Sequence, residues 1–85
     1  MASYKLLIKP SAVKEIEALP VKDRRRVVMR VRALATDPRP PGCEKLSGNN
    51  LYRVRQGHFR VLYSISDSES MLIVLKVGHR REVYR

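Results

Sequence analysis

The stretch that decides the fold is residues 51–66, which read LYRVRQGHFRVLYSIS. Apolar and polar residues alternate along most of it, and this period of two is typical of a β-strand with one buried face. Gln56-Gly57 interrupts the pattern with glycine in its second position, a signal for a type I′ hairpin turn. The sequence therefore predicts two antiparallel strands, Leu51–Arg55 and His58–Ser66.

The predicted turn also sets the register of the hairpin. With the turn at residues 56–57, Arg55 faces His58 and Arg53 faces Arg60. Because side chains alternate across a sheet, one face should be apolar and buried. That face would carry Tyr52, Val54, Phe59, Val61, Tyr63 and Ile65. The other face gathers the three arginines and His58, and no acid lies within the hairpin to neutralise them.

Like charges directly opposite each other destabilise a sheet. A cluster of arginines kept at this cost indicates an anion-binding face, and the alternative is a positive face that is simply solvated. Arginine is well suited to phosphate because its planar fork makes two parallel hydrogen bonds.

The residues before the hairpin predict a short strand and two helices. Tyr4 to Ile8 is an apolar run, which we interpret as an edge strand, and Lys9-Pro10-Ser11 opens a helix that ends before Pro20. A second helix should run from about Val21 to Ala35. Its buried stripe would be Val27, Val28, Val31, Leu34 and Ala35. The Pro-rich residues 37–42 cannot continue a helix and predict a loop.

After the hairpin, Met71 to Val77 is apolar on both faces, which favours a central strand covered by the helices. Gly78 would let the chain turn after it. The fold class expected is α+β: an N-terminal helical hairpin packed on a small, mainly antiparallel sheet. Residues 1–85 are enough for one domain with a modest core.

Charge is the unusual feature of the composition. Eighteen Lys and Arg against eight Asp and Glu give a net charge of +10, which indicates a polyanionic partner, either nucleic acid or an acidic protein. A membrane surface is less favoured, since no basic amphipathic helix stands apart from the fold.

Cysteine usage and the first residues indicate a compartment. Cys43 is the one cysteine, so an intramolecular disulfide is excluded, and with two histidines it does not make a zinc site. Residues 1–4 lack an apolar signal region, and no run approaches the ~18 apolar residues of a membrane span. We expect a cytoplasmic protein without a membrane partner, metal or cofactor.

The last eight residues, GHRREVYR, add three arginines, a histidine and an aromatic ring. Basic groups beside an aromatic residue are what recognition of single-stranded RNA needs. A frayed basic tail is the alternative for this segment. We expect the RNA-binding residues to be Arg53, Arg60, Lys76 and Arg81.

The sequence resembles the RelE type of toxin within the RelE/ParE superfamily. The resemblance covers nearly the whole chain. It is carried by the helical hairpin, by Lys45-Leu46-Ser47-Gly48, by residues 51–55 with 57–63, and by the ending Val77-Gly78-His79-Arg80-Arg81-Glu82-Val83-Tyr84.

The resemblance implies a ribonuclease that cleaves messenger RNA in the ribosomal A site, silenced by a cognate acidic antitoxin in a hetero-oligomeric complex. In that family the ribose 2′-oxygen attacks the adjacent phosphorus without a metal ion. The catalytic positions that match are Arg53, Arg55, Arg60, Arg80 and Tyr84. His79 is a further candidate, because imidazole has an ordinary pKa suited to proton transfer near neutrality.

One departure from the family concerns the general base. Some members have Lys where this chain has Arg53 and Arg55, and an arginine effectively cannot lose its proton. Proton transfer would then pass to His79, His58 or Tyr84, or the ribosome would supply catalysis by orienting the substrate. Two other functions stay open: a ParE-like inhibitor of DNA gyrase, and a nucleic-acid-binding module without catalysis.

Overall fold

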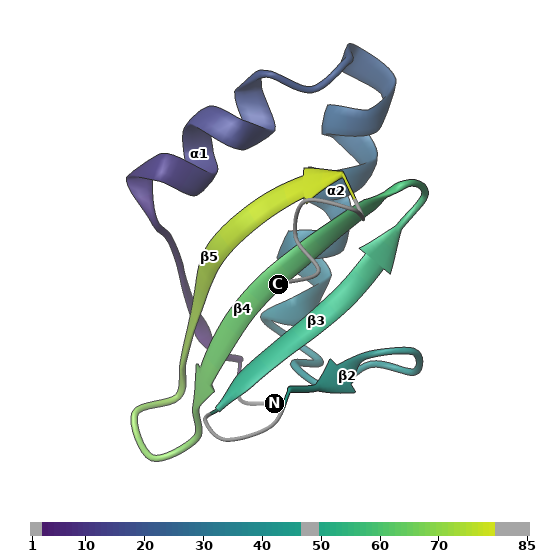
Figure 1. The fold of residues 1–85 in the computed structure, drawn as a ribbon. Coiled ribbons are helices and arrows are strands. Elements are labelled where there is room, and N and C mark those ends of the chain that lie inside the picture. Colours follow the sequence, from purple (N-terminus) through teal and green to yellow (C-terminus); the bar gives the residue numbers. More distant parts are fainter. Residues whose placement is uncertain (1–2, 47–49, 80–85) are drawn as a thin grey trace.

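The computed structural model describes residues 3–46 and 50–79. In these residues, two helices pack on one face of a five-stranded sheet with the strand order β1-β5-β4-β3-β2 (Figure 1). The elements are β1 (Lys5–Ile8), α1 (Pro10–Glu17), α2 (Val21–Leu34), β2 (Glu44–Lys45), β3 (Leu51–Gln56), β4 (Phe59–Ser66) and β5 (Met71–His79). The predicted α+β class is confirmed. No helix in the described ranges is long and apolar enough to cross a membrane.

The sheet is mixed, because β1 runs parallel to β5 while the other neighbouring strands are antiparallel. The predictions of an edge strand near the N-terminus and of a central last strand are confirmed by β1 and β5. Strand β2 was not predicted from the sequence; it pairs Glu44 with Arg53 and Lys45 with Tyr52 at the edge of the sheet. Two residues are too few to show a period, which explains the omission.

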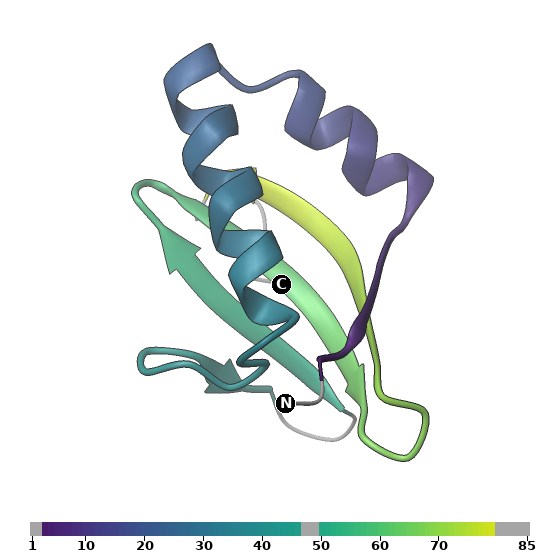
Figure 2. The ribbon, with the colours of Figure 1, turned by 180° about the vertical axis from the view of Figure 1, so that it is seen from behind.

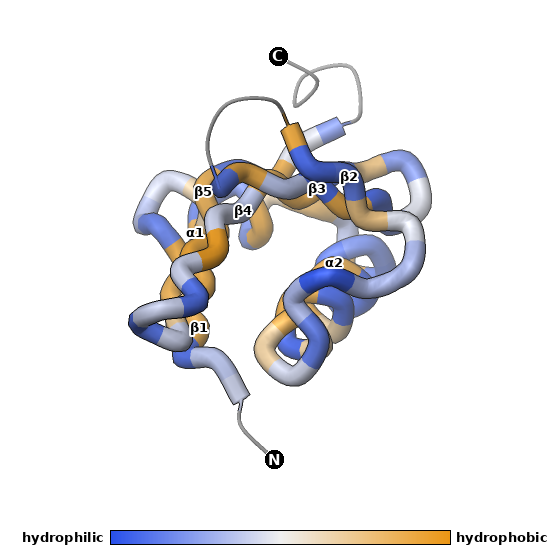
Figure 3. The backbone as a smooth tube through the Cα atoms, turned by 90° about the horizontal axis from the view of Figure 1, so that it is seen from below, coloured by the Kyte–Doolittle hydropathy of each residue, from blue (hydrophilic) through white to orange (hydrophobic). Residues whose placement is uncertain are grey.

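The helices cover one face of the sheet and leave the other face without a helix among the described residues (Figure 2). In Figure 3, where the backbone is coloured by the hydropathy of each residue, hydrophobic residues concentrate where the helices meet the strands. The core consists of Ala12, Ile16, Val27, Val31, Leu34, Tyr52, Val54, Val61, Tyr63, Ile65, Leu72, Val74 and Val77. The predicted apolar face of the hairpin is therefore confirmed.

The predicted hairpin turn is wrong by one residue. The two connecting residues are Gly57 and His58, so that Gln56 pairs with Phe59 and Arg55 pairs with Arg60. Gly57 has a φ of 61°, and glycine in the first turn position is the arrangement of a type II′ turn, which also matches the twist of the strands. The positive φ thus falls on the residue that adopts it without strain.

The shifted turn changes which residues pair across the hairpin, but each strand residue keeps its predicted face of the sheet. Arg53 lies opposite Leu62 instead of Arg60, a difference of two positions, and the side-chain period in a strand is two. His58 leaves the strand for the turn. The expectation that the chain turns at Gly78 is also wrong, because β5 continues through it and pairs Gly78 with Arg60.

A hydrogen-bonded clamp holds the Pro-rich loop against the far end of the sheet. Arg39 donates from both terminal nitrogens to the carboxylate of Asp67, at 3.2 and 2.8 Å, and its Nε donates to the Tyr52 hydroxyl at 3.2 Å. Tyr4 donates its hydroxyl to Asp67 as well. These hydrogen bonds hold the pKa of Asp67 below its ordinary value, and the one from Arg39 has the larger effect. The loop that leads into β2 is thereby fixed.

A second contact secures the same loop from inside the core. The hydroxyl of Tyr63, whose side chain is fully buried, donates to the carbonyl oxygen of Pro38 at 2.7 Å. Burial raises the pKa of Tyr63, so the hydroxyl stays protonated and remains a donor.

Replacing Tyr63 with Phe should lower the free energy of unfolding by about 1–2 kcal/mol, because the Pro38 carbonyl loses its buried donor. Urea unfolding followed by circular dichroism measures this loss. The matched control is Tyr4→Phe, which removes an exposed hydroxyl bond to Asp67 and should cost less. An equal or smaller loss in Tyr63→Phe would show that the Pro38 contact does not stabilise the loop.

Candidate functional site

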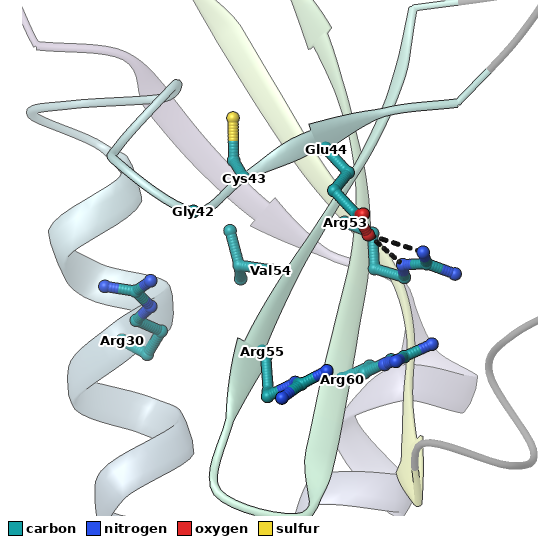
Figure 4. A pocket seen from close by; sticks show the side chains of 8 residues that line it. All are labelled: Arg30, Gly42, Cys43, Glu44, Arg53, Val54, Arg55 and Arg60. Carbon is teal, nitrogen blue, oxygen red and sulfur yellow. Dashed lines mark hydrogen bonds and ion pairs between the residues drawn. The ribbon is translucent and has the colours of Figure 1, made fainter.

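The candidate site lies where β3 loses its neighbour. Strand β2 pairs with Arg53 and Tyr52 only, so from Val54 onward β3 is a sheet edge within the described ranges. A pocket of about 720 Å³ opens there (Figure 4). It is lined by Arg30, Gly42, Cys43, Glu44, Arg53, Val54, Arg55 and Arg60. Three of the arginines predicted from the sequence are therefore brought together.

Arg53 is anchored by an acid that the sequence analysis did not assign. The residue is only 8% exposed, and its Nε donates to Glu44 Oε1 at 3.1 Å while Nη2 donates to the same oxygen. Glu44 reaches it because β2 places it directly opposite Arg53. Arg53 is thus held in one orientation, and its whole side chain is largely buried.

The pKa of Glu44 is affected by all three arginines on the outer face. Its pKa is held below the ordinary value, first by the hydrogen bonds from Arg53 and then by the charges of Arg53, Arg60 and Arg55. Since the carboxyl stays charged through neutral pH, it offsets part of the positive charge. One carboxylate does not balance three guanidinium groups, and the pocket remains cationic.

Arg55 and Arg60 form a direct cross-strand pair on the face away from the helices. Arg55 is exposed and Arg60 is half-buried. Figure 4 shows the side chains of Arg53, Arg55 and Arg60 leaving the hairpin on the same side. The guanidinium forks of Arg55 and Arg60, with the Glu44-bound guanidinium of Arg53 beside them, can hold a phosphate and stabilise negative charge that develops on it.

His79 and Lys76 lie elsewhere. Both line another pocket, of about 230 Å³, between α1 and β5. Lys76 Nζ lies 3.4 Å from Glu15 Oε2, and Glu15 Oε1 accepts the Val77 backbone N–H at 2.8 Å. Glu15 thereby satisfies an amide of β5 beyond the end of β1, where that strand would otherwise be an open edge.

The ring contacts of His79 place it on the helix-facing side of the sheet. Its imidazole meets Phe59 edge-on, with the ring centroids 6.0 Å apart, and it stacks with His58 at 6.3 Å. Phe59 packs against the core. The structure therefore does not bring His79 or Lys76 into the pocket of the arginines. Arg80, Arg81 and Tyr84, which the sequence analysis also selected, lie outside the described residues.

Sequence reasoning missed Glu44 and Arg30 in this pocket. Arg30 had a signal: it lies three residues after Val27 and four before Leu34, both in the buried stripe, so it had to border the core. Glu44 had none, because an isolated acid after a Pro-rich loop shows no period. Cys43 lines the pocket as well, as a free thiol.

Residues 6–84 match the family described as ParE toxin of type II toxin-antitoxin system, parDE. The chain is 27% identical over 86 residues to a protein of Methanocaldococcus jannaschii named RelE1, and the match covers 96% of each chain.

Solved structures agree with these matches. The RelE–RelB complex of Pyrococcus horikoshii contains a chain that is 31% identical, with a TM-score of 0.83, covering 92% of this chain and 96% of that one. The RelBE2 toxin–antitoxin complex of Mycobacterium tuberculosis contains a chain that is 25% identical, with a TM-score of 0.81 and 94% coverage of both.

The chain is a toxin of a type II toxin–antitoxin system. It belongs to the RelE/ParE superfamily and is of the RelE type. The resemblance inferred from the hairpin and the C-terminal motif is confirmed.

Replacing Glu44 with Gln should strengthen binding of inorganic phosphate a few-fold, because the pocket gains one net positive charge at short range. Titration followed by NMR of the arginine Nε–H groups measures it. The unsubstituted protein should show the same gain only in acid, below the ordinary range of a glutamate, since the pKa of Glu44 is lowered. The control Glu69→Gln makes the same charge change in the β4–β5 turn and should leave affinity unchanged; a Glu44→Gln affinity no higher than this control contradicts the prediction.

Proposed function

We propose that this toxin is an endoribonuclease that cleaves messenger RNA in the ribosomal A site and so inhibits translation in the cytoplasm. The observation that supports the proposal is the cluster of Arg53, Arg55 and Arg60 on one outer face of the sheet, with a single carboxylate beside it in the described residues. A toxin acting only through protein contact has no need of converging guanidinium groups.

The proposed reaction is transfer of the phosphoryl group, within the RNA strand, from the 5′-oxygen of one nucleotide to the 2′-oxygen of the nucleotide before it. The ribose 2′-oxygen attacks the adjacent phosphorus, loses its proton to a base, and forms a 2′,3′-cyclic phosphate as the bond to the 5′-oxygen breaks. The departing 5′-oxygen takes up a proton, so that atoms and charges balance. The enzyme must therefore move two protons and stabilise a phosphorane that carries additional negative charge.

We assign charge stabilisation to Arg55 and Arg60, which lie opposite each other and converge on the outer face. Arg53, fixed by Glu44, would position the scissile phosphate from the neighbouring position. In this proposal the guanidinium groups supply the positive charge, and no metal ion takes part. Arginine holds its proton, so it serves as an electrostatic group and not as a base.

Proton transfer is assigned to the C-terminal residues. Tyr84 is the candidate that the family motif gives for proton transfer at the nucleophile. Arg80, from the same motif, would neutralise the charge that develops on the leaving oxygen. His79 is the weaker candidate for the base, since it lines the pocket between α1 and β5. Orientation of the RNA by the ribosome would contribute the remainder of the rate, because positioning alone is worth several orders of magnitude.

We further propose that a cognate antitoxin silences the toxin in a hetero-oligomeric complex. The relatives from Pyrococcus horikoshii and Mycobacterium tuberculosis were solved as toxin–antitoxin complexes. A net charge of +10 favours an acidic partner segment that orders on binding.

The second candidate function is inhibition of DNA gyrase by protein contact. The family description that matches residues 6–84 names ParE, and this observation keeps the candidate open. It differs from the first in one respect that can be measured: it leaves messenger RNA intact.

Mapping of messenger RNA 5′ ends in a translating extract tests the proposal. We expect cuts at fixed codon positions that fall more than about 100-fold in Arg60→Gln, because loss of one preorganised charge donor has effects of this size. Arg80→Ala should also remove them. The control Arg25→Gln, an exposed residue of α2, should cleave normally.

The same extract ranks the candidates for proton transfer. If the base is not His79, the variant His79→Gln should retain more than about a tenth of the activity. Tyr84→Phe should retain less than about a tenth. Intact messenger RNA together with inhibited gyrase would overturn the ribonuclease in favour of the second function.

A further inference from the structure

Arg30 occupies an unusual position for a charged side chain. It projects from α2 into the pocket at the edge of β3, on the side of the strand opposite to Arg53, Arg55 and Arg60 (Figure 4). The residue is half-buried, and its Nε is fully buried with no hydrogen-bond partner among the described residues. Its charge is close enough to the Tyr63 hydroxyl to oppose the rise in that pKa.

An unpartnered buried donor needs an explanation. A buried N–H without an acceptor costs free energy, and native proteins contain few such groups. A solvated arginine could instead be presented from the outer side of α2, as Arg25, Arg26 and Arg32 are. Position 30 lies within the stripe that borders the core, where an aliphatic residue would contribute more stability.

The pocket joins Arg30 to the proposed phosphate site. Its wall runs from Arg30, past Gly42 and Cys43, around the open edge of β3 at Val54, to Arg55 and Arg60. A strand of RNA that places one phosphate on the outer arginines can therefore continue around this edge to the other face.

We propose that Arg30 forms an additional phosphate subsite, which binds a phosphodiester of the RNA strand adjacent to the one that is cleaved. This inference rests on the proposed ribonuclease function and adds the path of the substrate around β3. Arg30 is a binding residue in this account and takes no part in bond breaking.

The lining of the pocket favours RNA over an acidic peptide. Peptide grooves are built around large apolar anchors, whereas the apolar side chains that line this pocket in the described residues are the small ones of Val54 and Cys43. Four guanidinium groups with one carboxylate suit a chain that carries a charge on every phosphate.

The test uses the full-length chain and a trinucleotide with 2′-deoxy sugars, which cannot be cleaved. Arg30→Met keeps the length of the aliphatic stem and should weaken binding roughly tenfold. It should also lower the slope of log K against log salt by about 0.7, the value for one phosphate contact on a single strand. The control Arg32→Met removes the same charge from an exposed position of the same helix and should bind within about threefold of the unsubstituted protein.

A second measurement does not depend on any variant folding. In the unsubstituted protein, the Nε–H proton resonance of Arg30 should move downfield when the trinucleotide is added, because this donor gains a phosphate acceptor. A resonance that stays in place while the signals of Arg55 and Arg60 move would overturn the subsite.

The outcomes separate this inference from the proposed function. If Arg30→Met and Arg32→Met bind the trinucleotide equally while messenger RNA is still cleaved, the subsite is wrong and the ribonuclease stands. If Arg30→Met weakens binding of hexaglutamate but not of the trinucleotide, the pocket is a peptide site and the inference is overturned. If the unsubstituted protein cleaves no messenger RNA, the proposed function fails first.

Discussion

The cross-strand pair of Arg55 and Arg60 is the feature around which the rest of the site is arranged. Two guanidinium charges directly opposite each other in an antiparallel pair repel, and the third arginine on the same face, Arg53, adds to the repulsion. The fold offsets part of this repulsion with Glu44, whose pKa is lowered first by the hydrogen bonds from Arg53 and then by the charges of Arg53, Arg60 and Arg55. What remains is a positive face that an anion can stabilise.

The position of Glu44 depends on contacts far from the arginines. The loop before β2 is held by the Arg39–Asp67 ion pair on the outside and by the Tyr63 hydroxyl on the inside. Strand β2 follows this loop and begins at Glu44, which lies opposite Arg53. Because β2 runs antiparallel to β3 and begins there, the β3 edge from Val54 onward stays open. A structural clamp thus determines both the counter-ion and the access to the pocket.

The fold could be predicted well from the sequence because its signals are local. The period of two in residues 51–66 identifies the hairpin faces, and Pro10 and Pro20 mark the first helix. The turn was displaced by one residue because Gly57 can occupy either position of a two-residue turn, and the choice depends on which residue takes the positive φ.

The candidate site was predicted less completely, since its composition depends on contacts between distant segments. Alternation alone brought Arg53, Arg55 and Arg60 to one face. His79 pairs with Phe59, so it lies on the other face of the sheet, with the apolar side chains. Its placement depends on the register between β4 and β5, which the sequence does not show. Glu44 and Arg30 join the pocket from β2 and α2, and no spacing within the hairpin could reveal them.

The central claim is that the arginine pair is retained for binding an anion, at a cost in stability. The most direct test is the free energy of unfolding of Arg55→Gln, measured with urea at low salt. The account predicts that this variant is more stable than the unsubstituted protein by about 0.2–1 kcal/mol, and that the difference shrinks at high salt as the charges are screened. A variant that is less stable at low salt would contradict the claim, because Arg55 would then be a structural residue of the sheet.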